Sequence, residues 1–286
     1  MPFAPASKLN PIATFLIPVF RRRLRRLAGR LSSDSAITRL REPQTRIVWH
    51  VAAPKSGSTW VSKVLSEGLA ERGWSSSMLY TTGRAVRREQ TLDLRALFDL
   101  KHPHGPVFAT HQHCPYSEYA RSFIEEHDVR VILQVRDLFD CLVSFVDHLD
   151  NNPLVPMAFM TREQWGALDH AQRCRFVTDL VAPWYIRFWA GWYQAWRESG
   201  LDIRLVRYEA LCAEPARTFQ DLTEFCTGQA ADLREVKRWM EAYGREGTRL
   251  NRGVSGRGRD WPEAHRQRIR SWVELYPETD FSPLGL

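Results

Sequence analysis

The chain has 286 residues, of which 44% are hydrophobic and 12% aromatic. This is enough apolar side chain to bury a substantial core, which excludes a chain that stays unfolded. A formal net charge of +7 at pH 7 favours anionic partners such as phosphate-bearing small molecules, nucleic acid or an acidic membrane surface. The five cysteines include no C-x-x-C pair and no zinc-ligand spacing, which indicates a reduced, cytoplasmic protein.

The first 44 residues differ in composition from the rest, so we expect a leader over residues 1–44 and one domain over residues 45–286. Residues 11–33 read PIATFLIPVFRRRLRRLAGRLSS, and their apolar run is shorter than the ~20 residues that a membrane-spanning helix needs. The arginines follow this run, whereas a secretory signal places its positive charge first. Two interpretations stay open. Residues 11–31 either form a helix, from Phe15 to Leu31, on an anionic membrane surface, or belong to a poorly ordered basic leader.

Beyond the leader, short apolar runs alternate with segments of helical periodicity. The runs predict strands over residues 46–53, 106–110, 129–135 and the first half of 201–211. Helices are predicted over residues 59–73, 117–128, 137–149, 181–200, the end of 201–211 and 213–226. Asp137 is a candidate cap for the third of these helices. Such alternation predicts a three-layer, P-loop-like α/β fold with a central parallel sheet flanked by helices.

A small-residue loop, PKSGSTW at residues 54–60, joins the first strand to the first helix. In an ATP-binding P-loop, the lysine follows the second glycine, but here Lys55 precedes Gly57 by two residues. This displacement weakens the interpretation as a P-loop kinase. The backbone amides of Ser56, Gly57, Ser58 and Thr59 still lie at a strand-to-helix turn, where they are placed to bind a phosphate group.

The loop resembles the P-K-S-G-T-T-W loop of the cytosolic-type sulfotransferases, which bind the 5′-phosphosulfate of 3′-phosphoadenosine-5′-phosphosulfate (PAPS). Four other segments follow in the order of that family, so the resemblance covers roughly residues 46–272. In VFATHQHCP, His111 matches the catalytic base of the family. A neutral histidine, with an ordinary pKa near ~6.5, accepts a hydroxyl proton at cytoplasmic pH. His113 is a rival at the same strand end.

The resemblance also implies a nucleotide site. In VILQVRDLFDCLVSF, Arg136 and Ser144 match the 3′-phosphate clamp of the family, although a structural ion pair of Arg136 with Asp137 or Asp140 is the alternative. In LVRYEAL and NRGVSGRGRDW, the matching residues are Tyr208 at the adenine and Arg252 and Gly253 at the 3′-phosphate. Trp60 matches the tryptophan that stacks on the adenine, with helix packing as its alternative role.

The function that these matches imply is transfer of a sulfuryl group from PAPS to an acceptor hydroxyl or amine of a small molecule, lipid or sugar. Lys55 would stabilise charge on the departing phosphate, and no metal is expected. Two other functions stay open: a small-molecule kinase, and a non-catalytic protein that binds a nucleotide or nucleic acid, although we expect no nucleic-acid partner. The family usually carries a lysine where this chain has Ala109, and His113 or Thr59 is a candidate replacement.

Two segments between the motifs, residues 75–100 and 150–170, are the expected walls of the acceptor pocket. The side chains in and near these segments are compatible with two kinds of acceptor. One group of nearby side chains would make the pocket apolar: Phe145, Met157, Phe159, Met160 and Trp165. A second group would favour an acidic acceptor: Arg84, Arg87 and Arg88.

Overall fold

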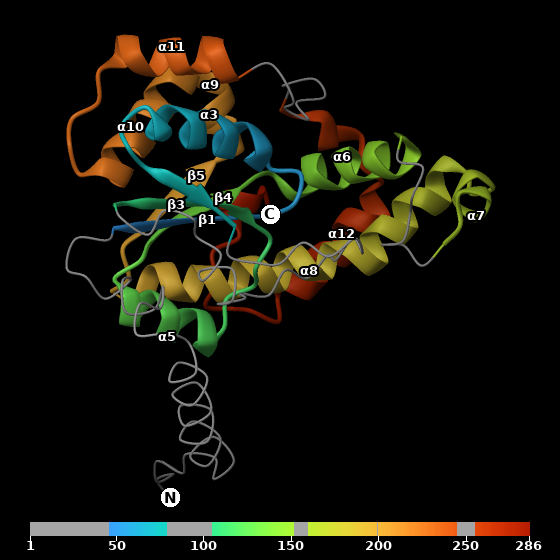
Figure 1. Ribbon diagram of the computed structural model, residues 1–286. Helices are drawn as coiled ribbons and strands as arrows, with labels where there is room; N and C mark the ends of the chain where they lie inside the picture. The colour runs from blue at the N-terminus through green and yellow to red at the C-terminus, as the bar shows by residue number, and fades with distance from the viewer. Residues whose placement is uncertain (1–45, 79–104, 152–159, 199, 245–254) are drawn as a thin grey trace, which may run out of the picture.

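The protein is described by a computed structural model over residues 46–78, 105–151, 160–198, 200–244 and 255–286. The expected leader, residues 1–44, lies outside these ranges. The centre of the fold is a five-stranded sheet in the order β2-β3-β1-β4-β5, in which every neighbouring pair is parallel (Figure 1). The strands are β1 (Ile47–Ala52), β2 (Ser75–Ser77), β3 (Val107–Gln112), β4 (Arg130–Val135) and β5 (Ile203–Arg207).

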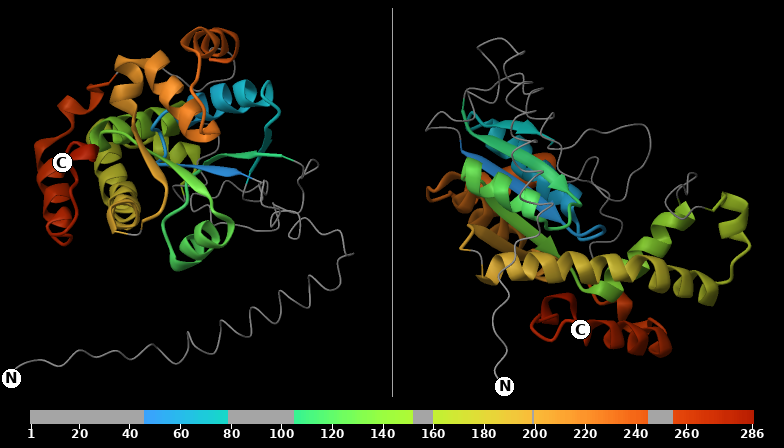
Figure 2. Two further views of the ribbon diagram at one scale, coloured as in Figure 1. Left: turned by 90° about the vertical axis from the view of Figure 1, so that its left-hand side faces the viewer. Right: turned by 90° about the horizontal axis from the view of Figure 1, so that it is seen from below.

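Helices cover both faces of this sheet, which confirms the predicted three-layer architecture (Figure 1 and Figure 2). One layer contains α3 (Ser58–Ala70), α9 (Tyr208–Ala213), α10 (Pro215–Thr227) and α11 (Leu233–Tyr243). The other contains α5 (Glu118–His127), α6 (Leu138–Asn151), α7 (Arg162–Gly166), α8 (His170–Glu198) and α12 (Glu263–Val273). None of the helices in the described ranges is long and apolar enough to cross a membrane.

The two faces of the sheet bury two separate apolar clusters because successive side chains of a strand point to opposite sides. Val48 of β1 packs in the cluster under α3, α10 and α11, whereas Trp49 and Val51 pack in the larger cluster under α5, α6 and α8. All six residues of β1 are buried. A strand buried on both faces is typical of the interior of a parallel sheet, which is where β1 lies.

The aromatic side chains of α8 are packing residues. Phe188, Trp189 and Trp192 are at most 1% exposed and belong to the larger cluster. The indole of Trp192 donates to the carbonyl of Cys114, 2.8 Å away, and meets the ring of Trp49 edge to face at 5.9 Å. The helix is therefore fixed to the sheet along its apolar stripe.

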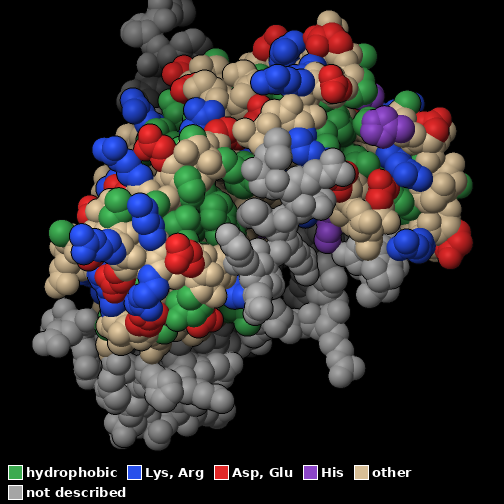
Figure 3. Space-filling model, turned by 90° about the horizontal axis from the view of Figure 1, so that it is seen from above, with side chains coloured by type: hydrophobic (Ala, Val, Ile, Leu, Met, Phe, Trp, Pro, Cys, Tyr) green, Lys and Arg blue, Asp and Glu red, His purple; other side chains and the backbone are tan. Residues whose placement is uncertain are grey.

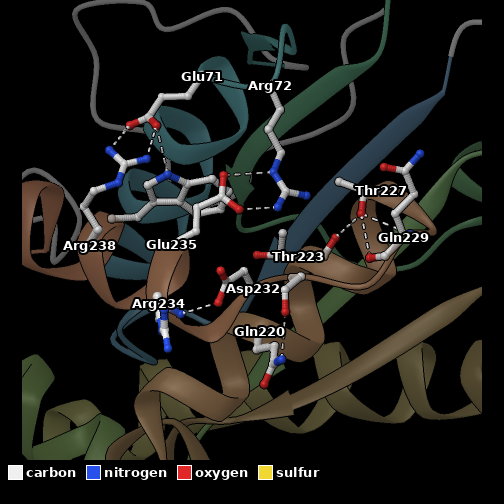
Figure 4. Close-up of polar contacts among 12 residues, drawn as sticks. Glu71, Arg72, Gln220, Thr223, Thr227, Gln229, Asp232, Arg234, Glu235 and Arg238 are labelled. Carbon is white, nitrogen blue, oxygen red and sulfur yellow. Dashed lines mark hydrogen bonds and ion pairs between the residues drawn. The ribbon is translucent and has the colours of Figure 1, made fainter.

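Helix α11 packs closely on α3 on the opposite side of the molecule. A Cβ atom added at Gly68 would lie 2.3 Å from the ring of Trp239, so only glycine permits this approach. Glu71 accepts hydrogen bonds from Arg238 around the same contact (Figure 4). It also accepts hydrogen bonds from the indole of Trp239 and the hydroxyl of Tyr243. The Arg238 and Tyr243 hydrogen bonds lower the pKa of Glu71 to about 2.

Charged side chains of both signs are interspersed over the face of the molecule seen from above, the side of α3 and α11 (Figure 3). A nucleic-acid backbone is usually bound by a stripe or patch of a single positive sign. The described residues of this face do not form one. The expectation that nucleic acid is not a partner stays a prediction.

Candidate active site

The loop between β1 and α3 is fixed by hydrogen bonds to its carbonyl oxygens. The hydroxyl of Tyr185 donates to the carbonyl of Pro54 at 2.7 Å, and Nη1 of Arg136 donates to that of Lys55 at 3.2 Å. Nε2 of Gln134 donates to the carbonyl of Ser56 at 2.6 Å. Because the C=O and N–H of one peptide unit point in opposite directions, the amide of Gly57 points away from Gln134. The carbonyls of Pro54, Lys55 and Ser56 thus face the protein. Within the loop, the amide of Ser56 donates to the carbonyl of Ala53, whereas the amide of Gly57 points outward.

The backbone of the loop also has the conformation of an anion-binding turn. Lys55 and Gly57 have φ angles of 62° and 83°, both in the left-handed region. Alternation of right- and left-handed residues brings successive amides to one concave side. Helix α3 begins directly after Gly57 with no side-chain cap and no acidic residue in its first turn. Its positive end is therefore available to an anion, and the residues present fit a phosphate group.

Tyr208 lies under this loop. A Cβ atom added at Gly57 would come within 2.7 Å of the Tyr208 ring, and the guanidinium of Arg136 lies 4.1 Å from the centre of the same ring. The ring is buried, and burial raises the pKa of the Tyr208 hydroxyl. Tyr208 therefore supports the loop and Arg136 through packing. Its expected contact with adenine stays a prediction.

Arg136 directly follows β4 and makes the ion pair that was its alternative role. Its Nη2 lies 3.1 Å from Oδ2 of Asp140, and both side chains are buried. A guanidinium has five N–H donors, so this pair is compatible with a further contact to a phosphate. Ser144, the other half of the expected clamp, is half-buried on α6. The clamp itself stays a prediction.

Asp140 was not predicted as a site residue, yet it joins three parts of the structure. Besides Arg136, its carboxylate accepts hydrogen bonds from the amides of Gly256 at 2.8 Å and Gly258 at 2.7 Å. The amide of Asp140 donates to Oδ1 of Asp137 at 2.9 Å, which confirms Asp137 as the cap of α6. Asp140 thereby holds the glycine-rich segment that starts the 3-10 helix η2 (Arg257–Asp260). Arg252 and Gly253 lie outside the described residues.

Trp60 packs within its own layer. Its ring meets that of Phe219 edge to face, with centroids 5.3 Å apart, and its indole nitrogen approaches Gly244. The side chain is half-buried. The packing role that was its alternative is therefore present, and adenine stacking stays a prediction.

An irregularity in β3 determines where His111 points. Trp49 pairs with Ala109 and Val51 pairs with Gln112, so β3 has one residue more than β1 between these points. Such a bulge re-aims a side chain. Ala109 and Gln112 both face the larger cluster, whereas His111 contacts Ser62 of α3 on the other face. A lysine in place of Ala109 would point into the larger cluster and away from His111. The lack of the family lysine at this position therefore removes no side chain from the surroundings of His111.

His111 and His113 lie next to the loop between β1 and α3. Their rings are 5.6 Å apart, and Nδ1 of His113 donates to the carbonyl of Ala52, the last residue of β1, at 2.8 Å. A carbonyl only accepts, so His113 carries its proton on Nδ1. Burial and then the positive charge of Lys55 lower the pKa of His113. The cation of the loop and the two histidines therefore lie at one edge of the sheet.

The site as a whole consists of a turn at the end of β1 that fits a phosphate group, a lysine, and two histidines at the end of the neighbouring strand. A profile of the sulfotransferase domain matches residues 46–272 of this chain. The chain belongs to the sulfotransferase family. Membership confirms the expected enzyme class, a PAPS-dependent sulfotransferase, and the residues over which the resemblance was expected.

Three solved structures are similar to this chain. A mouse sulfotransferase, SULT7A1, crystallised with 3′-phosphoadenosine-5′-phosphate (PAP), is 17% identical, with a TM-score of 0.59 over 85% of this chain and 89% of that one. A retinol dehydratase crystallised with androsterone and PAP is 14% identical, with a TM-score of 0.47 over 84% of each chain. An Arabidopsis thaliana putative steroid sulphotransferase is 14% identical, with a TM-score of 0.46 over 88% of this chain and 82% of that one. A search of curated protein sequences found no significant match.

Most of the residues expected to line the acceptor pocket of this sulfotransferase lie outside the described ranges: Arg84, Arg87, Arg88, Met157 and Phe159. Phe145 and Trp165 are described, and both are only 3% exposed in the larger cluster. The indole of Trp165 donates to Asp150 at 2.7 Å. These two side chains are therefore core residues and not an exposed pocket wall. Met160 is partly buried against the same cluster.

Proposed function

We propose that this sulfotransferase moves the sulfuryl group of PAPS to a hydroxyl or amine of a small-molecule, lipid or sugar acceptor, with His111 as the general base. The observation that carries the proposal is the hydrogen bond between His113 and the carbonyl of Ala52. It ties the segment that bears His111 to the last residue of β1, two residues before the loop begins. The base and the donor site thus lie side by side at the carboxyl edge of the sheet, where parallel folds bind ligands.

The loop supplies the electrostatic part of the reaction. In the transition state, negative charge builds up on the phosphate that leaves PAPS. The outward amides at the start of α3 and the ammonium of Lys55 stabilise that charge, and they are already in place before the reaction starts. Because a sulfuryl group carries less charge than a phosphoryl group, no metal ion is required in this scheme. Metal-free chemistry stays a prediction.

His111 supplies the proton-transfer part. As the acceptor oxygen forms its bond to sulfur, the bond from sulfur to the bridging oxygen breaks, and the proton of the acceptor hydroxyl passes to the imidazole. A general base of this kind contributes ~10²–10⁴-fold to the rate. His113 is a weaker candidate because burial, and to a smaller extent the neighbouring Lys55, lower its pKa.

The first test is binding of PAP by calorimetry without magnesium, compared with ADP and with magnesium ATP. We expect PAP to bind most tightly and Arg136→Ala to weaken it. A protein that bound magnesium ATP in place of PAP would be a kinase. The second test is sulfate transfer from radiolabelled PAPS by His111→Gln. The variant should bind PAP like the wild type and lose turnover by ~10²–10⁴-fold, whereas His113→Gln should lose less. Unchanged turnover in His111→Gln would refute the base assignment.

A further inference from the structure

A buried polar chain connects His111 to the interior of the protein. The hydroxyl oxygen of Ser62, on α3, lies 3.1 Å from Nδ1 of His111 and 2.9 Å from Nδ1 of His50. The same oxygen accepts a hydrogen bond from the backbone amide of His111 at 2.8 Å. Nε2 of His50 lies 2.8 Å from Oε1 of Gln134. His50 and Gln134 are both fully buried in central strands. A buried polar side chain requires a hydrogen-bond partner, and these two side chains are partners of the network that reaches His111.

The direction of each hydrogen bond follows from the donors and acceptors available. Nε2 of Gln134 donates to the carbonyl of Ser56, which fixes the amide so that Oε1 faces His50. An amide oxygen only accepts, and therefore Nε2 of His50 carries a proton. Burial lowers the pKa of His50 to about 3, so the imidazole is neutral and its Nδ1 has no proton. Nδ1 of His50 consequently accepts the hydrogen of the Ser62 hydroxyl.

The hydrogen-bonding site that remains on the Ser62 hydroxyl determines the tautomer of His111. A hydroxyl has one hydrogen and two acceptor sites. The hydrogen is used on His50, and one acceptor site takes the backbone amide of His111. The contact between the Ser62 oxygen and Nδ1 of His111 must then be a donation from His111. His111 therefore carries its proton on Nδ1, and Nε2 is the basic nitrogen.

We infer that His50, Ser62 and Gln134 are positioning residues that hold His111 in the Nδ1-protonated tautomer, so that Nε2 takes the proton of the acceptor. This inference rests on the proposed function, because it assigns the atom of His111 that acts as base. In the opposite tautomer, Nε2 would carry a hydrogen and could not accept one. This chain of His50, Ser62 and Gln134, called the relay below, also keeps a hydrogen-bond acceptor at Nδ1 of His111 when the imidazole becomes positively charged. Ser62 thus supports both states of the base.

The tautomer is measurable directly in the full-length enzyme with ¹⁵N-labelled histidine and long-range ¹H–¹⁵N correlation spectra. The chain has nine histidines, and the signals of His111 are those lost in His111→Gln. We expect the wild-type enzyme near pH 7.5 to show His111 protonated at Nδ1. A wild-type spectrum with the proton on Nε2 would overturn the inference without any relay variant.

Variants then test whether Ser62 sets this state. In Ser62→Ala we expect the proton of His111 to spread over both ring nitrogens. The kcat should fall by about tenfold or more, with the ~10²–10⁴-fold contribution of a general base as the upper limit. The KM for PAPS should change by less than about threefold. Ser66→Ala is the matched control, because Ser66 lies one turn later on α3 and its hydroxyl makes no hydrogen bond within the described residues. It should keep both the spectrum and kcat of the wild type.

His50→Leu provides the second variant. Without His50, the hydrogen of Ser62 turns to Nδ1 of His111, and the proton of His111 should move to Nε2. An unchanged His111 spectrum in folded His50→Leu and Ser62→Ala would overturn the inference. Its failure is distinct from failure of the proposed function. His111→Gln with full turnover refutes the base, whereas an inactive His111→Gln together with an Nε2-protonated wild type refutes only the relay.

Discussion

Substitution of Asp140 provides a severe test of the site, because one buried carboxylate holds Arg136 and two backbone amides at once. Asp140 is 1% exposed and Arg136 is 6% exposed. Removing one partner of a buried ion pair costs ~3–5 kcal/mol, because the other charge is left uncompensated. Asp140→Ala also leaves the amides of Gly256 and Gly258 without their acceptor. We expect the free energy of unfolding to fall by about 3–5 kcal/mol.

The assay is urea unfolding followed by tryptophan fluorescence, with PAP affinity measured on the folded variant. The matched control is Asp147→Ala on the same helix, which removes a partly exposed pair with Arg257 and should cost ~0–1 kcal/mol. PAP affinity should fall at least about tenfold in Asp140→Ala because Arg136 loses its orientation. If both variants lose the same small amount of stability, the ion pair is not the contact that holds this region, and the argument from burial is wrong.

The remaining predictions concern the loop, the buried histidine and the leader. Gly57→Ala should weaken PAP binding and destabilise the fold more than Gly73→Ala, since both glycines have φ above 80° but only Gly57 has a ring, Tyr208, where the methyl would lie; equal losses would mean that the ring is not the obstacle. For His50, the folded pKa of about 3 lies below the ordinary 6.5, so the unfolded chain takes up a proton first as pH falls. The free energy of unfolding should therefore decrease by up to ~1.4 kcal/mol per pH unit below 6.5, less steeply in His50→Gln; identical pH slopes would contradict this. Deletion of residues 1–40 should abolish sedimentation with anionic vesicles if the leader binds membranes, and unchanged sedimentation would refute that role.

The fold could be predicted largely because its central strands are short apolar runs with clear ends. β1, β3 and β4 were expected at nearly the positions where they lie. β2 could not be found in this way, since its three serines lie at the edge of the sheet and are not buried enough to require an apolar pattern. Helices α11 and α12 were not predicted either. The hydrophobic pattern of the sequence thus identifies the strands and helices that form the core and misses those that pack at its periphery.

The candidate site was predicted in part, and the missing part has a physical reason. The loop, Arg136 and His111 carry a sequence pattern, whereas Asp140 and the His50–Ser62 contact depend on which strands become neighbours. The bulge in β3 likewise depends on how β3 pairs with β1. Without the bulge, His111 would point to the same face of the sheet as Ala109, into the larger cluster. A histidine and a glutamine inside buried strands were nevertheless a usable signal, because a buried polar side chain requires a partner.

The anchoring of the loop by distant donors has a consequence for folding. The hydroxyl of Tyr185 reaches the carbonyl of Pro54 across 131 residues of sequence, and Gln134 reaches Ser56 across 78. A chain that is still being synthesised cannot shape the loop until α8 has been made and packed. Ligand affinity should therefore arise late, together with the complete core, and PAP should bind only the fully folded enzyme. Added PAP will then raise the unfolding midpoint by mass action, and the size of that rise will report occupancy of the loop in cell extracts as well as in purified protein.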